Sequence, residues 1–172
     1  LLDAEQKIVH IVRDRIGIKP LYYTVQKNTL IFASDIKTII SSGYYVPKIN
    51  YEGLWHNFSL QMAPRPLTCF EGIQAFEPGT VTTVHLQTGK LQKQSSWELE
   101  NFIHPPAKIQ NENEALNQLD NLLQDATKLR LSADVEVATF MSGGVDSTTI
   151  SSIAAQKHSG IKAFTLSFAE DE

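Results

Sequence analysis

One short segment combines glycines with hydroxyl and carboxylate side chains, a set of residue types suited to binding phosphate. It reads SGGVDS, residues 142–147, and it lies between an apolar run and a helical pattern. At the carboxyl end of a parallel strand, the following helix presents N–H groups without intrahelical partners and the positive end of its dipole. Gly143 and Gly144 let the backbone turn without a Cβ and let anionic oxygens approach the amides. The segment predicts a phosphate-binding loop, with Ser142 and Ser147 as extra donors.

Asp146 is the unexpected member of this loop, because a carboxylate repels phosphate. Its presence is explained if a divalent cation takes carboxylate and phosphate oxygens together. The loop lacks the lysine of G-x-x-x-x-G-K-[ST], and it is not G-x-G-x-x-G. One alternative stays open at this point: a tight strand-to-helix turn in which Asp146 and Ser147 only cap the helix.

The elements around the loop form one β-α-β pattern. We expect a strand over 135–141, a helix over 148–158 and a second strand over 161–168, the start of a parallel sheet. The preceding helix, over 114–131, carries an apolar stripe at helical spacing. A buried leucine contributes about 1.5–3 kcal/mol, so this stripe requires a partner surface. Its members are Ala115, Leu119, Leu122, Ala126 and Leu129, widened by Leu116 and Leu123.

The first hundred residues are β-rich. Short β-branched and apolar runs predict strands over 7–14, 21–25 and 29–34, and a hairpin joins 79–86 to 90–99. Two short helices are expected: 35–40, capped by Ser34 and closed by Gly43, and 51–60, capped by Asn50. Residues 63–73 are irregular, and the polar, proline-interrupted stretch 100–113 has the composition of a linker.

Composition restricts the class of protein. The 172 residues are 42% hydrophobic and 20% charged, with a formal net charge of −4. No basic patch indicates nucleic acid or an anionic membrane as a partner, and no apolar run is long enough to span a bilayer. Cys69 is the only cysteine, which predicts a cytoplasmic location without an internal disulfide.

The loop and its surroundings resemble the glutamine-hydrolysing asparagine synthetases. SGGVDS resembles the pyrophosphate loop of the N-type ATP pyrophosphatases, and RLSADVEVATFMSGGVDSTTISSIAA resembles the opening of the synthetase domain. VRDRIGIKPLYY, FASDIKTII and FEGIQAFEPGTV are similar to consecutive landmarks of the glutaminase domain. Departures from the family pattern are Ala133, Glu136, Ala138 and, inside the loop, Val145 for leucine, which leave the phosphate-facing groups intact.

The resemblance implies a fold class and a division of the chain. The fold is α+β, a partial Ntn-hydrolase-type αββα glutaminase domain, followed by α/β, the start of a parallel-sheet ATP pyrophosphatase domain. The glutaminase part covers 1–98, the linker 99–111 and the synthetase part 112–172. The chain is expected to be a fragment of the larger enzyme, and a homodimer is left open.

The resemblance also implies the ligands and their residues. ATP and Mg²⁺ are the expected cofactors, and aspartate and glutamine or ammonia the other small molecules. Asp146 is the implied metal ligand. For Met141 and Leu166, implied to lie against the nucleotide, core packing is an equally good interpretation. The implied ATP-binding residues are Met141, Ser142, Gly143, Gly144, Val145, Asp146, Ser147 and Leu166.

The implied reaction is adenylation of the aspartate side chain followed by attack of ammonia. The family's glutaminase nucleophile is an N-terminal cysteine, and no residue of this chain matches it: Leu1 has no nucleophilic atom and Cys69 is internal. No catalytic residue is therefore assigned, and the chain alone is expected to be inactive. Two alternatives remain: a relative acting on another carboxylate, of the β-lactam synthetase type, and a non-catalytic nucleotide-binding remnant.

Three other groups of residues carry weaker signals. Charged residues between 13 and 19 favour a salt-bridged structural bend, although the resemblance allows a role in positioning the glutaminase pocket. The five histidines have no metal-ligand spacing, and the acidic residues 170–172 are typical of a solvated end. The charged residues of the bend are Arg13, Asp14, Arg15 and Lys19.

Overall fold

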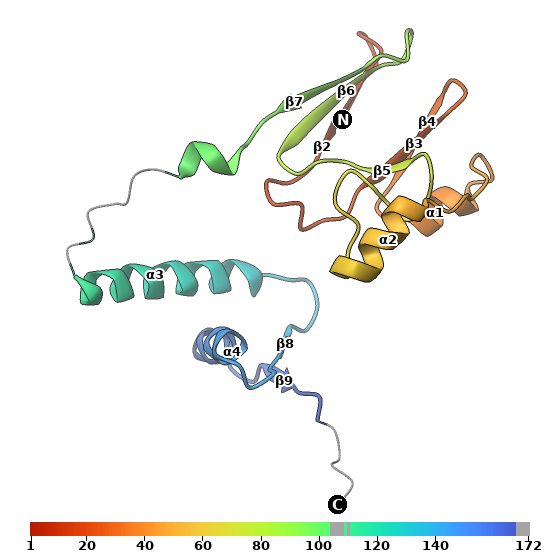
Figure 1. The fold of residues 1–172 in the computed structure, drawn as a ribbon. Coiled ribbons are helices and arrows are strands. Elements are labelled where there is room, and N and C mark those ends of the chain that lie inside the picture. Colours follow the sequence, from red (N-terminus) through yellow and green to blue (C-terminus); the bar gives the residue numbers. More distant parts are fainter. Residues whose placement is uncertain (104–108, 110, 168–172) are drawn as a thin grey trace, which may run out of the picture. The chain divides into compact units, whose positions relative to one another are not determined.

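Two antiparallel sheets build the first half of the protein. The computed structural model describes residues 1–103, 109 and 111–167. One sheet has the order β1-β2-β6-β7 and the other β4-β3-β5 (Figure 1). Their strands are β1 (Leu2–Asp3), β2 (Ile8–Val12), β3 (Tyr22–Gln26), β4 (Thr29–Ala33), β5 (Ile73–Ala75), β6 (Thr80–His85) and β7 (Leu91–Ser95).

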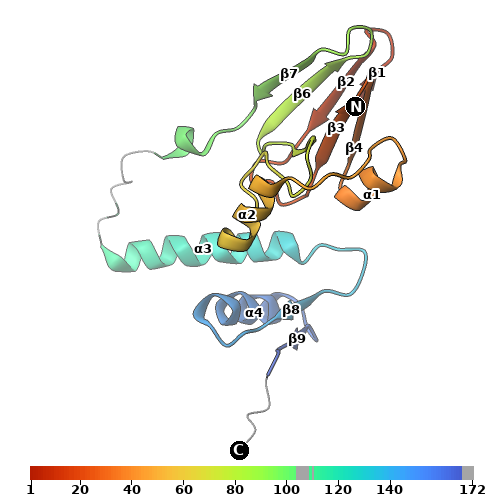
Figure 2. The same cartoon turned by 45° about the vertical axis from the view of Figure 1, so that its right-hand side comes forward.

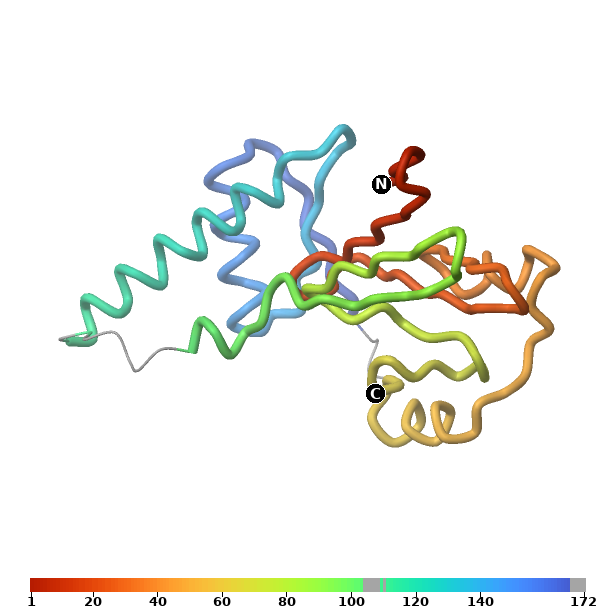
Figure 3. The backbone as a smooth tube through the Cα atoms, turned by 90° about the horizontal axis from the view of Figure 1, so that it is seen from above, coloured from red at the N-terminus to blue at the C-terminus, as the bar shows by residue number. Residues whose placement is uncertain are grey.

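The two sheets share a core. Ile11 of β2 and Val84 of β6 form one buried cluster with Tyr23 of β3 and with Phe76, which follows β5. Along β6 buried and half-buried residues alternate, as expected for a strand with one face in a core. β2 pairs with β6 although they are far apart in sequence, and the two run side by side in the tube view (Figure 3).

Two helices belong to this half. α1 (Ile36–Ser41) packs on β3 and β4 (Figure 2), and its fully buried Ile39 forms a second core cluster with Tyr45 and Ile73. α2 (Tyr51–Leu60) is capped as predicted by Asn50, which accepts a hydrogen bond from the Gly53 N–H at 3.3 Å. The cap of α1 is Asp35 rather than the predicted Ser34. The Asp35 carboxylate accepts from the Lys37 N–H at 2.7 Å, so the helix begins one residue later.

The bend at residues 13–19 is structural, as favoured from the sequence, but it is not salt-bridged within the described residues. Arg13 donates to the carbonyl oxygens of Gly17, Lys19 and Phe76. The Asp14 carboxylate accepts from the N–H groups of Ile18 at 2.8 Å and Lys19 at 3.1 Å. Backbone groups therefore take the place of the expected ion pairs.

The second half consists of two helices and a pair of parallel strands. After a 3₁₀ turn, η1 (Leu99–Phe102), the elements are α3 (Glu112–Arg130), β8 (Ala138–Phe140), α4 (Val145–Lys157) and β9 (Lys162–Phe164). β8 and β9 pair in parallel, with Ala138 opposite Lys162. By its contacts the chain divides into two units, Leu1–His104 and Pro105–Glu172. None of the helices in the described part is both long and apolar enough to cross a membrane.

The leucine stripe of α3 is largely uncovered, against the expectation that it is buried. Leu119, Leu122 and Leu129 are more than half exposed, whereas Thr127 is buried. α4 is the helix that packs on α3 in the described structure. This contact leaves Thr127 buried and most leucines of the stripe exposed. Of the remaining predicted features, His104 and residues 170–172 lie outside the described residues.

Candidate functional site

The turn between β8 and α4 is made by two glycines with different functions. Gly143 has a φ of +82°, a left-handed conformation that glycine adopts without strain. A Cβ on Gly143 would meet no atom within 4 Å, so backbone conformation rather than crowding explains the residue. Gly144 is the N-cap of α4, with φ −73° and ψ 162°, and no side chain caps the helix. The helix begins three residues earlier than predicted, and the capping alternative for Asp146 and Ser147 is wrong.

The two serines hold the loop closed on itself. The Ser147 hydroxyl accepts from the Ser142 N–H at 3.2 Å and donates to the Gly144 carbonyl oxygen at 3.2 Å. The two hydroxyl oxygens lie 3.0 Å apart. Either hydroxyl can be the donor in this pair. The two serine side chains are thus hydrogen-bonded within the loop.

Four amide groups of the loop remain unpaired within the part of the chain that the structure describes. The first intrahelical bond of α4 runs from the Thr148 N–H to the Gly144 carbonyl oxygen at 3.1 Å. The three preceding helical amides have no acceptor, as the geometry of a helix start requires, and the Gly143 amide has none either. The unpaired amides belong to Gly143, Val145, Asp146 and Ser147. They form a concentrated donor site at the positive end of a 13-residue helix.

Asp146 lies in the first turn of α4 and is exposed. No three His, Cys, Asp or Glu side chains of the described chain are close enough together to form a metal site. Magnesium bound to phosphates needs only one or two carboxylates, because water and phosphate oxygens fill its other positions. A single carboxylate beside a row of free amides fits that arrangement.

Met141 and Leu166 both follow the ends of the parallel strands. The half-buried Met141 donates its N–H to the Phe164 carbonyl oxygen at 2.8 Å, which joins the ends of β8 and β9. Leu166 is 81% exposed, so the core-packing interpretation is wrong for it in the described chain. Carboxyl ends of parallel strands meet at one edge of a sheet, so both residues lie at the same edge as the loop.

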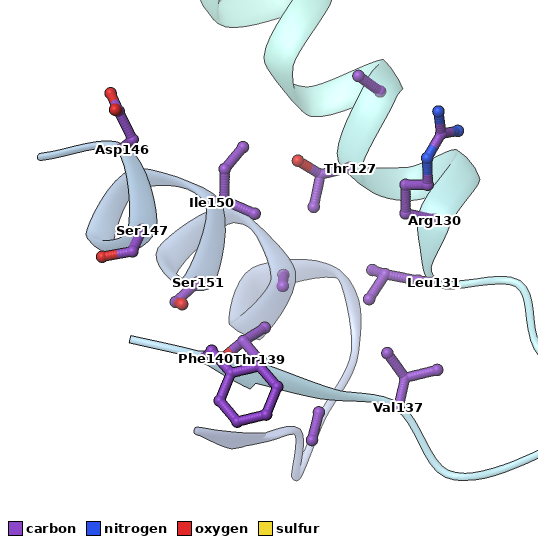
Figure 4. Close-up of a pocket in the computed structure, with 13 residues that line it drawn as sticks. Thr127, Arg130, Leu131, Val137, Thr139, Phe140, Asp146, Ser147, Ile150 and Ser151 are labelled. Atoms are coloured by element: carbon purple, nitrogen blue, oxygen red, sulfur yellow. The ribbon is translucent and has the colours of Figure 1, made fainter. Parts of the chain in front are cut away.

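A cleft of about 570 Å³ adjoins the loop, between α3, β8 and α4 (Figure 4). Its wall includes Asp146 and Ser147 and is otherwise mostly apolar. Three hydroxyls in the wall are buried and have no hydrogen-bond partner: those of Thr127, Thr139 and Ser151. Buried polar groups are nearly always paired, so these oxygens mark a place for water or a polar ligand group.

These three hydroxyls were not predicted from the sequence. The signal that could have identified them is a β-branched polar residue, Thr127, next to the leucine stripe of α3, at a position that faces a neighbouring helix.

Family models match both halves of the chain. A glutamine amidotransferase domain model matches residues 1–97, and an asparagine synthase model matches residues 118–172. The first of these matches covers more than half of the 172 residues.

Similar proteins bear the names of asparagine synthetases and amidases. The chain is 32% identical to glutamine-hydrolysing asparagine synthetase 2 of Bacillus subtilis, over 95% of this chain and 23% of that protein. It is 30% identical to a putative glutamine-hydrolysing asparagine synthetase of Methanocaldococcus jannaschii, over 87% of this chain and 29% of the relative. It is 31% identical to amidase chyE of Penicillium rubens, over 99% of this chain and 27% of that protein.

The chain thus spans about a quarter of the length of these relatives. The two family models follow one another along the chain, as the sequence motifs predict. The chain belongs to the family of the glutamine-hydrolysing asparagine synthetases.

Proposed function

We propose that the chain supplies the phosphate-binding part of the ATP site of an asparagine synthetase. The observation that carries this proposal is the row of unpaired amides at Gly143, Val145, Asp146 and Ser147. They bind the β- and γ-phosphates of ATP, since amides at a helix start favour anions. Met141 and Leu166, at the same edge, border the nucleotide.

The reaction we propose is the ATP-dependent amidation of aspartate. The side-chain carboxylate of aspartate attacks the α-phosphorus of ATP and displaces pyrophosphate, which leaves an acyl-adenylate. Ammonia released from glutamine then attacks the acyl carbon, and AMP departs to give asparagine. The loop amides stabilise the charge that collects on the departing pyrophosphate, and they are already oriented before the reaction begins.

Asp146 is the residue we assign to Mg²⁺. The bound ion would neutralise phosphate charge and act as a Lewis acid toward the leaving group. Asp146 lies in the first turn of α4, between Val145 and Ser147, whose amides are unpaired in the described structure.

For the glutaminase reaction we assign no nucleophile in this chain. Cys69, the only cysteine of the sequence, is a half-buried internal residue. The Cys69 thiol lies 3.9 Å from the Gly53 carbonyl oxygen, a weak contact typical of a small packed side chain.

The function is tested by replacing Asp146 in a protein that contains this chain within a complete synthetase domain. We expect Asp146→Ala to lower aspartate-dependent release of pyrophosphate from ATP by about a hundredfold or more, because the metal–phosphate contact is lost. Asp125→Ala is the matched control, an exposed carboxylate of α3 outside the loop, and should leave the rate unchanged.

Two results would contradict the proposal. Unchanged turnover of Asp146→Ala would exclude the metal-ligand role. Pyrophosphate release that depends on a different carboxylate, and not on aspartate, would instead support the β-lactam synthetase type of relative.

A further inference from the structure

The first unit contains a second cleft, which the proposed function does not use. It has a volume of about 610 Å³, and every residue of its wall lies between residues 13 and 75. The wall includes Arg13 and Arg65, and no Asp or Glu side chain of the described chain lines it. The formal charge of the whole chain is −4. A cleft lined by two cations and no acid is therefore a positively charged site on a chain that is negative overall.

Arg13 is a buried cation that makes no ion pair within the described residues. It is 6% exposed, and no carboxylate in the described part of the chain lies within ion-pair distance of it. Three of its five N–H groups donate to backbone carbonyl oxygens, which fix the plane of the guanidinium. One N–H on each terminal nitrogen remains. A buried charge is ordinarily paired, so the remaining N–H groups favour an anion.

Arg65 adds a second positive charge at the same cleft. Burial lowers the pKa of the Arg13 guanidinium and the charge of Arg65 lowers it further, while the neighbouring Asp14 carboxylate acts in the opposite direction. Arginine stays protonated despite such a shift. Arg65 itself is exposed, and no ion pair holds it within the described residues.

The rest of the wall suits an organic anion better than a bare inorganic ion. Asn57 of α2 and Gln61, its C-cap, contribute carboxamides, and Tyr22 of β3 contributes a hydroxyl. The wall also contains apolar side chains, among them Ile18 and Leu67. A ligand with a short carbon chain and a charged group at each end suits a wall that combines two arginines with apolar surface.

We propose that this cleft binds a short dicarboxylate, with one carboxylate on the buried guanidinium of Arg13 and the other on Arg65. Planar guanidinium and carboxylate groups match one another in bidentate geometry. The site lies within the first unit and shares no residue with the phosphate loop. Evidence against the proposed function would therefore not exclude ligand binding in this cleft.

The test is calorimetric titration of the 172-residue chain with glutarate, a five-carbon dicarboxylate. Glutaramide, the uncharged analogue, and inorganic phosphate are titrated in parallel at the same ionic strength. We expect saturable binding of one glutarate per chain, with glutaramide and phosphate binding at least tenfold more weakly.

Variants at Arg65 separate this site from general surface charge. Arg65→Gln should weaken glutarate binding about tenfold or more, because a charge-assisted hydrogen bond is lost, and Arg65→Lys should weaken it less. Arg15→Gln is the matched control, an exposed arginine outside the cleft, and should bind as the unchanged chain does. Arg65 is exposed, so these changes test binding rather than folding.

Three results would overturn the inference. The first is no saturable binding of glutarate, and the second is equal binding by Arg65→Gln and the unchanged chain. The third is phosphate binding as tight as that of glutarate, which would replace the dicarboxylate by a small inorganic anion.

Discussion

Two buried threonine hydroxyl groups in the first unit differ in whether they have a hydrogen-bond partner. Thr68 and Thr82 are both buried. The Thr68 hydroxyl donates toward the Ile73 and Phe70 carbonyl oxygens, at 2.8 and 3.0 Å, and accepts from the Phe70 N–H at 3.1 Å. The Thr82 hydroxyl, on β6, has no partner within the described structure. The same residue type therefore stabilises the fold at one position and costs free energy at the other.

Replacing each threonine by valine tests this difference. We expect Thr82→Val to raise the free energy of unfolding by about 1 kcal/mol, because an unpaired polar group leaves the core while the side-chain volume is kept. Thr68→Val should lower it by about 1–3 kcal/mol, because the Phe70 N–H loses its acceptor and the Ile73 carbonyl oxygen loses a donor. Urea denaturation measures both, and each variant serves as the control of the other. Equal losses in the two variants would contradict the assignment of an unpaired hydroxyl at Thr82.

Arg13 illustrates what could be predicted at the residue scale. Its position in a charged bend was visible in the sequence, and so was a structural role. The partners were not predictable, because the carbonyl oxygen of Phe76 comes from a distant part of the chain. Neighbouring charges in a sequence favour ion pairs, whereas backbone acceptors become available only after the chain has folded.

At the scale of elements, α2 depends on a close approach of its backbone to another segment. Gly53 is buried, and a Cβ built on it would clash with the carbonyl oxygen of Thr68. The Asn50 amide reinforces the same contact by donating to that oxygen at 3.0 Å. Glycine is therefore needed for packing at this position, although it lowers helix propensity.

We expect Gly53→Ala to destabilise the first unit by about 1–3 kcal/mol, since the added methyl must displace backbone. The higher helix propensity of alanine would by itself stabilise the unit, by up to about 1 kcal/mol. Ser59→Ala, at an exposed position of the same helix, is the control and should change the free energy of unfolding by less than about 0.5 kcal/mol. A Gly53→Ala variant as stable as this control would show that the contact is not tight.

The sequence predicted the type and order of most elements, and it failed at specific boundaries. Asn50 was identified as a cap because a strong capping residue precedes a clear helical run. Ser34 and Asp35 are both good capping residues, so local preference does not decide between them, and the structure uses Asp35. The start of α4 was placed too late, because glycine at the N-cap gives no side-chain signal there.

The loop of the candidate site was predicted from its residue types, while its internal bonds were not. The glycines at 143 and 144 indicate a backbone that a ligand can approach closely. The structure shows that four amides of this loop have no hydrogen-bond partner in the described chain. The bond between the Ser142 and Ser147 hydroxyls depends on the exact turn, which no spacing rule gives. The burial of Thr127 in place of the α3 leucines depends on which helix packs against α3.

At the scale of the whole molecule, the two units differ in how much core they contain. The first unit has two buried clusters, around Phe76 and around Ile39. In the described part of the second unit only four side chains are buried: Thr127, Ser151, Ile153 and Ala154. A segment of this size with so small a core is marginally stable by itself.

Amide hydrogen exchange should reveal this contrast. We expect amides of β2, β6 and β3 to exchange at least about a hundredfold more slowly than those of α3 and α4, because exchange follows the local free energy of opening. Mass spectrometry of peptides from each unit measures both sets in one sample, so solution conditions are matched. Equal protection in the two units would mean that they open as one cooperative body.

The hydroxyl pair of Ser142 and Ser147 also bears on the thermodynamics of ligand exchange. A loop that is disordered before binding must be ordered each time a ligand arrives, at about 1–2 kcal/mol of backbone entropy per residue. Here the loop is already fixed by its own hydrogen bonds. That entropy is lost once, when the chain folds, so an anion that binds to the loop would not have to offset it again.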